Sequence, residues 1–150
     1  MNVYRISRAD YAKSLCSSGA ANRWNRRGQN VIYTGASRSL STLELVVHRG
    51  SVRPSIPYKV LVISLPEDEG FIQQIQIQDL PVNWRKMRAY SELQRIGSEW
   101  FDKMETLVLQ VPSAVIPKEC NFIINTEHPD FATHIKLLDT EDYFWDDRLA

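Results

Sequence analysis

The sequence predicts a single α+β domain whose sheet is mixed or mostly antiparallel. Its 150 residues are close to the usual size of one domain, and no repeat, low-complexity tract or linker divides them. Helical patterns dominate the first half of the chain, and short strand-like runs dominate the second. Because strands and helices do not alternate regularly, a doubly wound parallel sheet is not predicted.

The N-terminal part is predicted to form a strand, a helix, a loop and a second strand. Residues 2–6 alternate between apolar and polar side chains, as a half-buried strand does. Residues 8–18 suit a short helix that ends near Gly19. Residues 19–30 have glycine near both ends and suit an irregular loop, and the apolar residues 31–35 suit a short strand.

A longer helix and a strong strand are predicted next. The helix is expected to begin between Ser37 and Ser41 and to end at Gly50, because glycine is frequent just after a helix. Residues 58–65 are rich in β-branched side chains and precede Pro66, which predicts a strand. Residues 71–80 alternate in part and suit a short strand.

The rest of the chain combines one helix with several short strands. Residues 89–104 place Leu93, Ile96 and Trp100 on one stripe, which predicts a helix. Strand-like runs separated by proline or polar turns follow at residues 106–112, 114–117, 121–125 and 134–139. One compact domain over residues 1–150 accounts for all of these elements.

The composition argues against several classes of protein. Lys and Arg number 18, as do Asp and Glu, so no net field draws the chain to nucleic acid or to an anionic membrane. No apolar run reaches the ~18 residues that a membrane span needs, and the charged N-terminus is unlike a signal peptide. Cys16 and Cys120 are therefore expected to be reduced thiols in a cytoplasmic protein.

The common catalytic and metal-binding motifs are absent from the sequence. Neither G-x-G-x-x-G, nor G-x-x-x-x-G-K-[ST], nor G-x-S-x-G occurs, so the Rossmann, P-loop and α/β-hydrolase folds lack local support. His48, His128 and His134 have no recognisable metal-site spacing to cysteines or carboxylates. No metal is expected.

Glu44 most needs an explanation, because it lies in the most apolar helical run. Leu40, Leu43 and Val47 define a predicted inward stripe, and Glu44 lies on or beside it. A buried carboxylate without donors is strongly unfavourable or becomes protonated. Glu44 therefore either faces a cleft or completes a capping box, S/T-x-x-E, that begins at Ser41. The sequence leaves both alternatives open.

The arginines divide into those with and without an expected partner. Arg5 lies mid-strand between apolar neighbours and needs an anion, for which its guanidinium suits carboxylate or phosphate. Arg23 shares its loop with Arg26 and Arg27, which are expected to be solvated. Tyr33 is either an ordinary strand residue or a ring exposed to a site. Arginines, a ring and one inward carboxylate together suit a nucleotide-sugar ligand and glycosyl transfer.

In this order, the motifs resemble those of the RES-domain toxins of bacterial toxin–antitoxin pairs. After VYRI, the run RWNRRGQNVIYTGASRSLSTLELVVH is similar to the family's R-W-N-x-x-G-x-x-V-x-Y and its helix with a glutamate. Arg23 and Tyr33 are ten residues apart, and Tyr33 and Glu44 eleven. The resemblance continues over nearly the whole chain through LPVNWRK, LQRIGSEWF, VPSAVIPKECNFIINTEHPDF and DDRL.

This resemblance implies a fold like that of the ADP-ribosyltransferases, with a split mixed sheet, flanking helices and an NAD cleft. It implies a toxin that cleaves the nicotinamide–ribose bond of NAD+, a substrate and not a cofactor, by hydrolysis or phosphorolysis. Transfer of ADP-ribose to a cellular protein and a non-catalytic NAD-binding module remain open alternatives. The implied partner is an Xre-type helix-turn-helix antitoxin, with a homodimer compatible with the larger complex, and this chain is not expected to contact nucleic acid directly.

The resemblance also assigns roles to individual residues. Catalysis is assigned to Glu44, Arg23 and Tyr33, with Glu44 orienting the ribose and stabilising its developing positive charge. NAD binding is assigned to Arg5, Arg23, Tyr33, Ser113 and Asn125, the two arginines holding the phosphates. Asn125 departs from the family pattern, because a threonine follows it where the family has proline.

Overall fold

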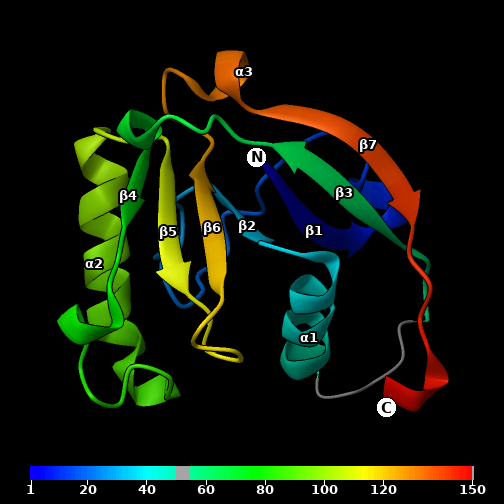
Figure 1. Ribbon diagram of the computed structural model, residues 1–150, viewed down its shortest axis with the longest axis horizontal. Helices are drawn as coiled ribbons and strands as arrows, with labels where there is room; N and C mark the ends of the chain where they lie inside the picture. The colour runs from blue at the N-terminus through cyan, green and yellow to red at the C-terminus, as the bar shows by residue number, and fades with distance from the viewer. Residues whose placement is uncertain (50–54, 150) are drawn as a thin grey trace.

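A single mixed sheet forms the centre of the chain. The computed structural model describes residues 1–49 and 55–149, and its sheet has the strand order β4-β5-β6-β2-β1-β3-β7 (Figure 1). The strands are β1 (Asn2–Arg8), β2 (Val31–Gly35), β3 (Tyr58–Ser64), β4 (Ile72–Gln74), β5 (Val108–Pro112), β6 (Cys120–Asn125) and β7 (Lys136–Asp142). β4 runs parallel to β5, and the other neighbouring pairs are antiparallel. The predicted α+β class and mixed sheet are confirmed.

The sheet consists of two halves with a narrow junction. β1 pairs with β3 along its whole length, and β2 pairs with β6 along its whole length. β1 and β2, in contrast, are paired at Tyr4 and Gly35 alone among the described residues. Figure 1 shows the strands on the two sides of this junction inclined to one another.

Three α-helices flank the sheet within the described residues. α1 (Arg38–Arg49) follows β2 almost immediately and contacts both β1 and β2, so it lies at the junction of the two halves (Figure 1). α2 (Tyr90–Lys103) packs Leu93 and Trp100 into the core and ends at Met104, which has the left-handed conformation common after helices. α3 (Phe131–His134) is a short helix before β7.

The core is divided between the two faces of the sheet. One cluster includes Val3, Ile32, Leu61 and Ile124. The other includes Trp24, Leu93, Trp100 and Ile123. Successive residues of a strand point to opposite faces. Ile124 of β6 belongs to the first cluster and Ile123 to the second, so the two clusters lie on opposite sides of the sheet. This division decides which of the predicted site residues share a face.

The predicted helix over residues 8–18 is wrong. A 3-10 turn over Ala9–Tyr11 is followed by irregular structure up to Gly19, which has φ +72°. The serines of this segment bond the local backbone instead of leaving it to a helix: Ser17 Oγ accepts from Gly19 N at 3.1 Å, and Ser18 Oγ accepts from Ala20 N at 3.2 Å.

Other elements differ from expectation in extent or type. Of residues 71–80, the strand covers Ile72–Gln74, and a 3-10 turn (Ile77–Asp79) follows. Residues 114–117 form a turn and not a strand, and β7 begins at Lys136 because His134 ends α3. The expectation that helices dominate the first half is wrong, since β1, β2 and β3 all precede residue 65.

The predicted helix after β2 is confirmed as α1, whereas its expected end at Gly50 lies outside the described residues. The predicted helix over residues 89–104 agrees closely with α2.

Both Cys16 and Cys120 are free thiols, the first exposed and the second half-buried. Within the described part of the chain, none of the helices has the length and apolarity of a membrane span.

Candidate functional site

The N-terminus of α1 decides between the two explanations of Glu44. Ser37 is the capping residue: its Oγ accepts a hydrogen bond from Leu40 N at 3.0 Å, and its carbonyl oxygen accepts one from Ser41 N at 3.1 Å. Ser41 lies inside the helix, where its Oγ donates to the Tyr4 carbonyl at 2.9 Å. The capping-box explanation is therefore wrong, and Glu44 is free for another role.

α1 also presents a different face to the sheet than the sequence suggested. Leu40 and Ser41 are the buried residues of the helix, whereas Leu43 and Val47 are 38% and 62% exposed. The predicted inward stripe is thus wrong beyond Leu40. The helix is rotated so that the half-buried Glu44 faces the ends of β5 and β6, from which its hydrogen-bond donors come.

One oxygen of Glu44 is held by two side chains distant in sequence. Ser113, directly after β5, donates from Oγ to Glu44 Oε1 at 2.7 Å. Asn121, in β6, donates from Nδ2 to the same oxygen at 2.8 Å. The other oxygen, Oε2, accepts no hydrogen bond from any of the described residues. The carboxylate is therefore fixed in orientation with one oxygen left for a ligand.

Ser113 is a donor whose direction is set by its surroundings. Its side chain is fully buried, and its Oγ accepts hydrogen bonds from Val115 N and Ile116 N, both at 3.1 Å. These two amides occupy the lone pairs of the hydroxyl, so its proton is directed at Glu44. The turn over residues 114–117, predicted as a strand, is what supplies these amides.

Asn121 belongs to the site although no sequence motif identifies it. Its Oδ1 is buried and has no hydrogen-bond partner among the described residues. Asn121 lies two positions before the buried Ile123 on the same face of β6, and a polar residue at the start of this strand was the available signal. Asn121 pairs with Gly35 across the sheet, and a Cβ on Gly35 would lie 2.5 Å from Ser41 Oγ. A glycine there lets α1 approach closely enough for Glu44 to reach Asn121.

Tyr33 lies on the same face of the sheet as Asn121. In the β2–β6 register Tyr33 pairs with Ile123, two residues from Asn121. Its hydroxyl donates to Asn25 Oδ1 at 2.6 Å and accepts from Trp24 N at 3.0 Å. Burial raises the pKa of Tyr33 well above its usual value, so the phenol is neutral at physiological pH. It fixes the arginine-rich loop onto the sheet.

Arg23 carries a charge that no carboxylate neutralises among the described residues. Its Nη1 donates to the carbonyl oxygens of Trp84 and Arg85 at 3.1 and 3.2 Å. Its guanidinium also lies over the Tyr90 ring, 4.8 Å from the centroid. These neutral partners hold the side chain while leaving its positive charge for an anion. The neighbouring Arg26 and Arg27 are exposed, as expected.

Arg5 lies on the opposite face of the sheet from Tyr33 and Glu44. It pairs with Leu61 of β3 and follows Val3 by two residues, and both of these belong to the first core cluster. Tyr4, in contrast, pairs with Gly35 and faces α1, with the Arg38 guanidinium 4.5 Å from its ring centroid. The structure therefore does not bring Arg5 and Arg23 together, and the predicted joint phosphate role stays a prediction.

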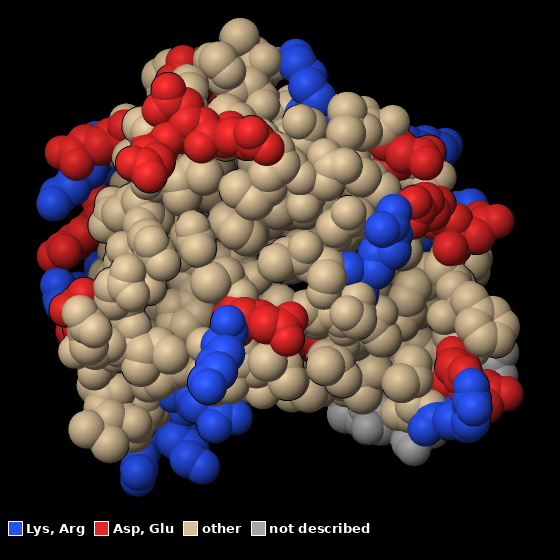
Figure 2. Space-filling model, in the orientation of Figure 1, with Lys and Arg blue, Asp and Glu red and all other residues tan. Residues whose placement is uncertain are grey.

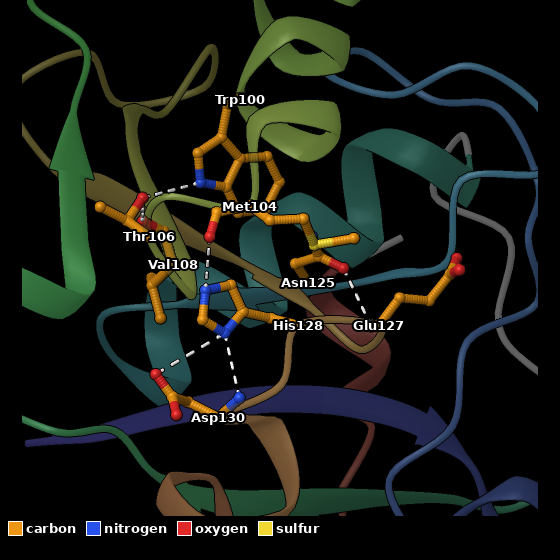
Figure 3. Close-up of polar contacts among 8 residues, drawn as sticks. All are labelled: Trp100, Met104, Thr106, Val108, Asn125, Glu127, His128 and Asp130. Atoms are coloured by element: carbon orange, nitrogen blue, oxygen red, sulfur yellow. Dashed lines mark hydrogen bonds and ion pairs between the residues drawn. The ribbon is translucent and has the colours of Figure 1, made fainter.

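Asn125 is fully buried at the far end of β6 from Asn121. Its Nδ2 donates to the Phe101 carbonyl at 3.3 Å and to Met104 Sδ at 3.4 Å, and its Oδ1 accepts from Glu127 N at 2.9 Å. Figure 3 shows this side chain beside Met104, with the neighbouring His128 ring bonded to the Met104 carbonyl. Asn125 thus joins the end of α2 to β6.

Charged groups are dispersed over the chain. On the face shown in Figure 2, Lys, Arg, Asp and Glu side chains lie mainly along the margin, and the middle is largely uncharged. In the part of the chain that the structure describes, no three His, Cys, Asp or Glu side chains gather in a way that could hold a metal ion.

Comparison with known proteins identifies the family to which this site belongs. The RES domain profile matches residues 2–146, which include Glu44, Ser113 and Asn121. The chain belongs to the RES domain family. The RES domain here is 34% identical to a "Toxin Res" of Photorhabdus laumondii subsp. laumondii over 154 residues, covering 100% of this chain and 97% of the relative.

Further relatives of the RES domain cover almost the same length. A "Toxin Res" of Yersinia enterocolitica is 32% identical, covering 99% of each chain. A "Prs ADP-ribosylating toxin" of a Sphingobium species is also 32% identical, covering 92% of this chain and 88% of the relative. The assignment to the RES-domain toxins made from the sequence motifs is confirmed.

Proposed function

We propose that this RES domain is a toxin that binds NAD+ and cleaves its nicotinamide–ribose bond. The observation that carries the proposal is Glu44, which has one carboxylate oxygen held by Ser113 and Asn121 and the other without a partner among the described residues. Membership of a toxin family with an ADP-ribosylating relative supports it. So does the neutral Tyr33 on the same sheet face.

In the proposed reaction, the bond between ribose C1′ and the nicotinamide nitrogen breaks, and both electrons leave with nicotinamide. Positive charge then develops on the ribose ring, as in other glycosyl transfers. A carboxylate already fixed by two hydrogen bonds stabilises that charge without reorganising. Glu44 Oε2 would face the ribose while Oε1 stays bound to Ser113 and Asn121. Water or phosphate adds at C1′ and loses a proton, giving ADP-ribose or its 1-phosphate.

Arg23 is the proposed partner of the NAD phosphates. Its guanidinium is held by neutral carbonyls and by the Tyr90 ring, so its charge is available to a phosphate. In this proposal Tyr33 lines the nicotinamide side and holds the loop that carries Arg23. Asn125 would support the pocket wall indirectly, because its side-chain atoms already bond α2 and Glu127. The ADP-ribosyltransferase-like cleft remains part of the proposal.

Transfer of ADP-ribose to a cellular protein is the second candidate. The Sphingobium relative named as a Prs ADP-ribosylating toxin favours it. Both candidates share cleavage of the same bond and differ in the acceptor that attacks C1′. Free ADP-ribose or its phosphate among the products supports degradation, whereas label from adenylate-labelled NAD+ retained on a protein supports transfer.

An Xre-type helix-turn-helix antitoxin is the proposed partner in the bacterial cytoplasm. The exposed apolar side chains Leu43 and Val47 lie on α1 beside Glu44, where a bound segment would cover the site. A homodimer within the larger complex and the lack of direct nucleic-acid binding by this chain are also part of the proposal. Co-purification of a small helix-turn-helix protein encoded beside this gene tests the partner.

The proposed activity is tested by nicotinamide release from NAD+ by the purified, antitoxin-free chain. We expect release by the wild type and almost none by Glu44→Gln, which keeps the size of the side chain and removes its charge. Glu99→Gln is the matched control, because Glu99 is an exposed helical glutamate paired with Arg95 on α2. Wild-type activity in Glu44→Gln, or no nicotinamide from the wild type, would contradict the proposal.

A further inference from the structure

A cavity lies on the face of the sheet opposite Glu44. Its volume is about 370 Å³, which is within the range of small-molecule pockets. Ile32 of β2 and Leu61 of β3 line its floor, and Leu15 of the irregular segment before Gly19 lines its wall. The sheet separates it from Glu44, Tyr33 and Asn121, so it is distinct from the proposed NAD site.

Arg5 lines this cavity, and its guanidinium has no partner within residues 1–49 and 55–149. The hydrogen bonds and ion pairs of the described residues include none from its guanidinium. Burial lowers the pKa of Arg5 from its usual value, with a smaller opposing effect from Cys16. A half-buried guanidinium without a counter-charge is unfavourable, and a bound anion removes that penalty.

The remaining lining residues define the class of anion. Apart from Arg5, the cavity is lined by no Lys, Arg, His, Asp or Glu, and hydroxyls such as those of Ser7 and Tyr11 provide hydrogen bonds. One positive charge balances a monoanion, whereas a phosphate dianion would leave an excess negative charge in a partly apolar cavity. A guanidinium also matches the two oxygens of a carboxylate in geometry.

We propose that this cavity binds a small monocarboxylic acid, with the carboxylate on Arg5 and an aliphatic or aromatic body against Leu15, Ile32 and Leu61. The irregular segment that replaces the predicted helix over residues 8–18 forms one wall of the site. The site binds its ligand whether or not the chain cleaves NAD+, because the two faces of the sheet are separate.

The first experiment measures binding of benzoate, hexanoate, benzamide and inorganic phosphate to the full chain by side-chain NMR of the arginine Nε–H groups. We expect benzoate or hexanoate to shift the Arg5 signal saturably, with a dissociation constant of about 1 mM or lower, and neutral benzamide not to do so. Arg5→Gln should weaken benzoate binding by at least about tenfold. Arg8→Gln is the matched control, since Arg8 is exposed on the same strand and pairs with Asp10.

A second experiment does not require the Arg5 variant to fold. Cys16 lines the cavity and is exposed, so its alkylation by iodoacetamide in a Cys120→Ser variant should slow when benzoate saturates the site. Absence of saturable carboxylate binding, equal binding by Arg5→Gln, tighter binding of phosphate than of carboxylates, or no protection of Cys16 would each overturn the proposal.

Discussion

The hydroxyl of Ser113 is the most informative single group to remove. In Ser113→Ala, Glu44 Oε1 loses one of its two donors, and the amides of Val115 and Ile116 lose their acceptor. Ser113 is fully buried, whereas Glu44, Val115 and Ile116 are half-buried, so water replaces these bonds only in part. Since each buried group left unsatisfied costs about 1–3 kcal/mol, we expect a loss of about 2–4 kcal/mol in the free energy of unfolding.

The consequences for melting temperature and for activity are separable. A loss of that size lowers the Tm of a domain of this length by about 5–15 °C, measured by circular dichroism. With the carboxylate held by Asn121 alone, a displacement of Glu44 by about 1 Å should lower kcat about 100-fold. KM should change much less, because no group proposed to bind the phosphates has been altered. The assay is nicotinamide release over a range of NAD+ concentrations, below the Tm of the variant.

Ser98→Ala is the control for a buried serine without a catalytic role. Ser98 is 3% exposed and donates to Gln29 Oε1 at 3.0 Å, so its removal should lower stability and leave kcat unchanged. Because Ser113 and Asn121 donate to the same oxygen, Ser113→Ala and Asn121→Ala should also be non-additive in kcat. A Ser113→Ala protein with lowered Tm but wild-type kcat would refute the positioning role.

Two further predictions concern Arg23 and Tyr33. Arg23→Lys should raise the dissociation constant for NAD+ about tenfold, measured by calorimetry, because lysine lacks the guanidinium fork. The exposed Arg26→Lys is the control and should leave that constant unchanged. If the two variants bind NAD+ with the same affinity, Arg23 is not part of the site. The raised pKa of Tyr33 means that the folded state keeps its proton when the unfolded state loses it, so wild-type stability should fall above about pH 10. In Tyr33→Phe, chemical denaturation should show a smaller fall over that range, and an identical fall would contradict the assignment.

Some features of the fold follow from local sequence alone. The alternation of residues 2–6 identified a strand because a period of two reports burial on one face of a sheet. The apolar run at Val31–Gly35 and the β-branched run after Tyr58 identified strands by their composition. The stripe of α2 identified that helix in the same way. The helix predicted over residues 8–18 was wrong because the serines of this segment bond the local backbone. Ala12 is the buried residue of the segment, so it has no apolar stripe that would pack a helix.

For the candidate site, the sequence identified individual residues but did not show which of them lie together. Glu44 and Ser113 were both identified, but their 2.7 Å hydrogen bond joins positions 69 residues apart. Asn121 was missed, since its role depends on the pairing of β6 with β2 and on the close approach of α1 over Gly35. No local sequence pattern indicates that β6 pairs with β2.

The sequence by itself determined the family and the α+β class, and it identified one carboxylate in an apolar helix as a candidate site residue. Motif order and periodicity can be read from the sequence without knowing which strands pair. The tertiary structure decided which face each candidate occupies. It directed Glu44 toward Ser113 and Asn121, and it directed Arg5 into a cavity on the other side of the sheet. The physical reason is that side chains alternate along a strand, so strand register and helix rotation determine which distant residues meet.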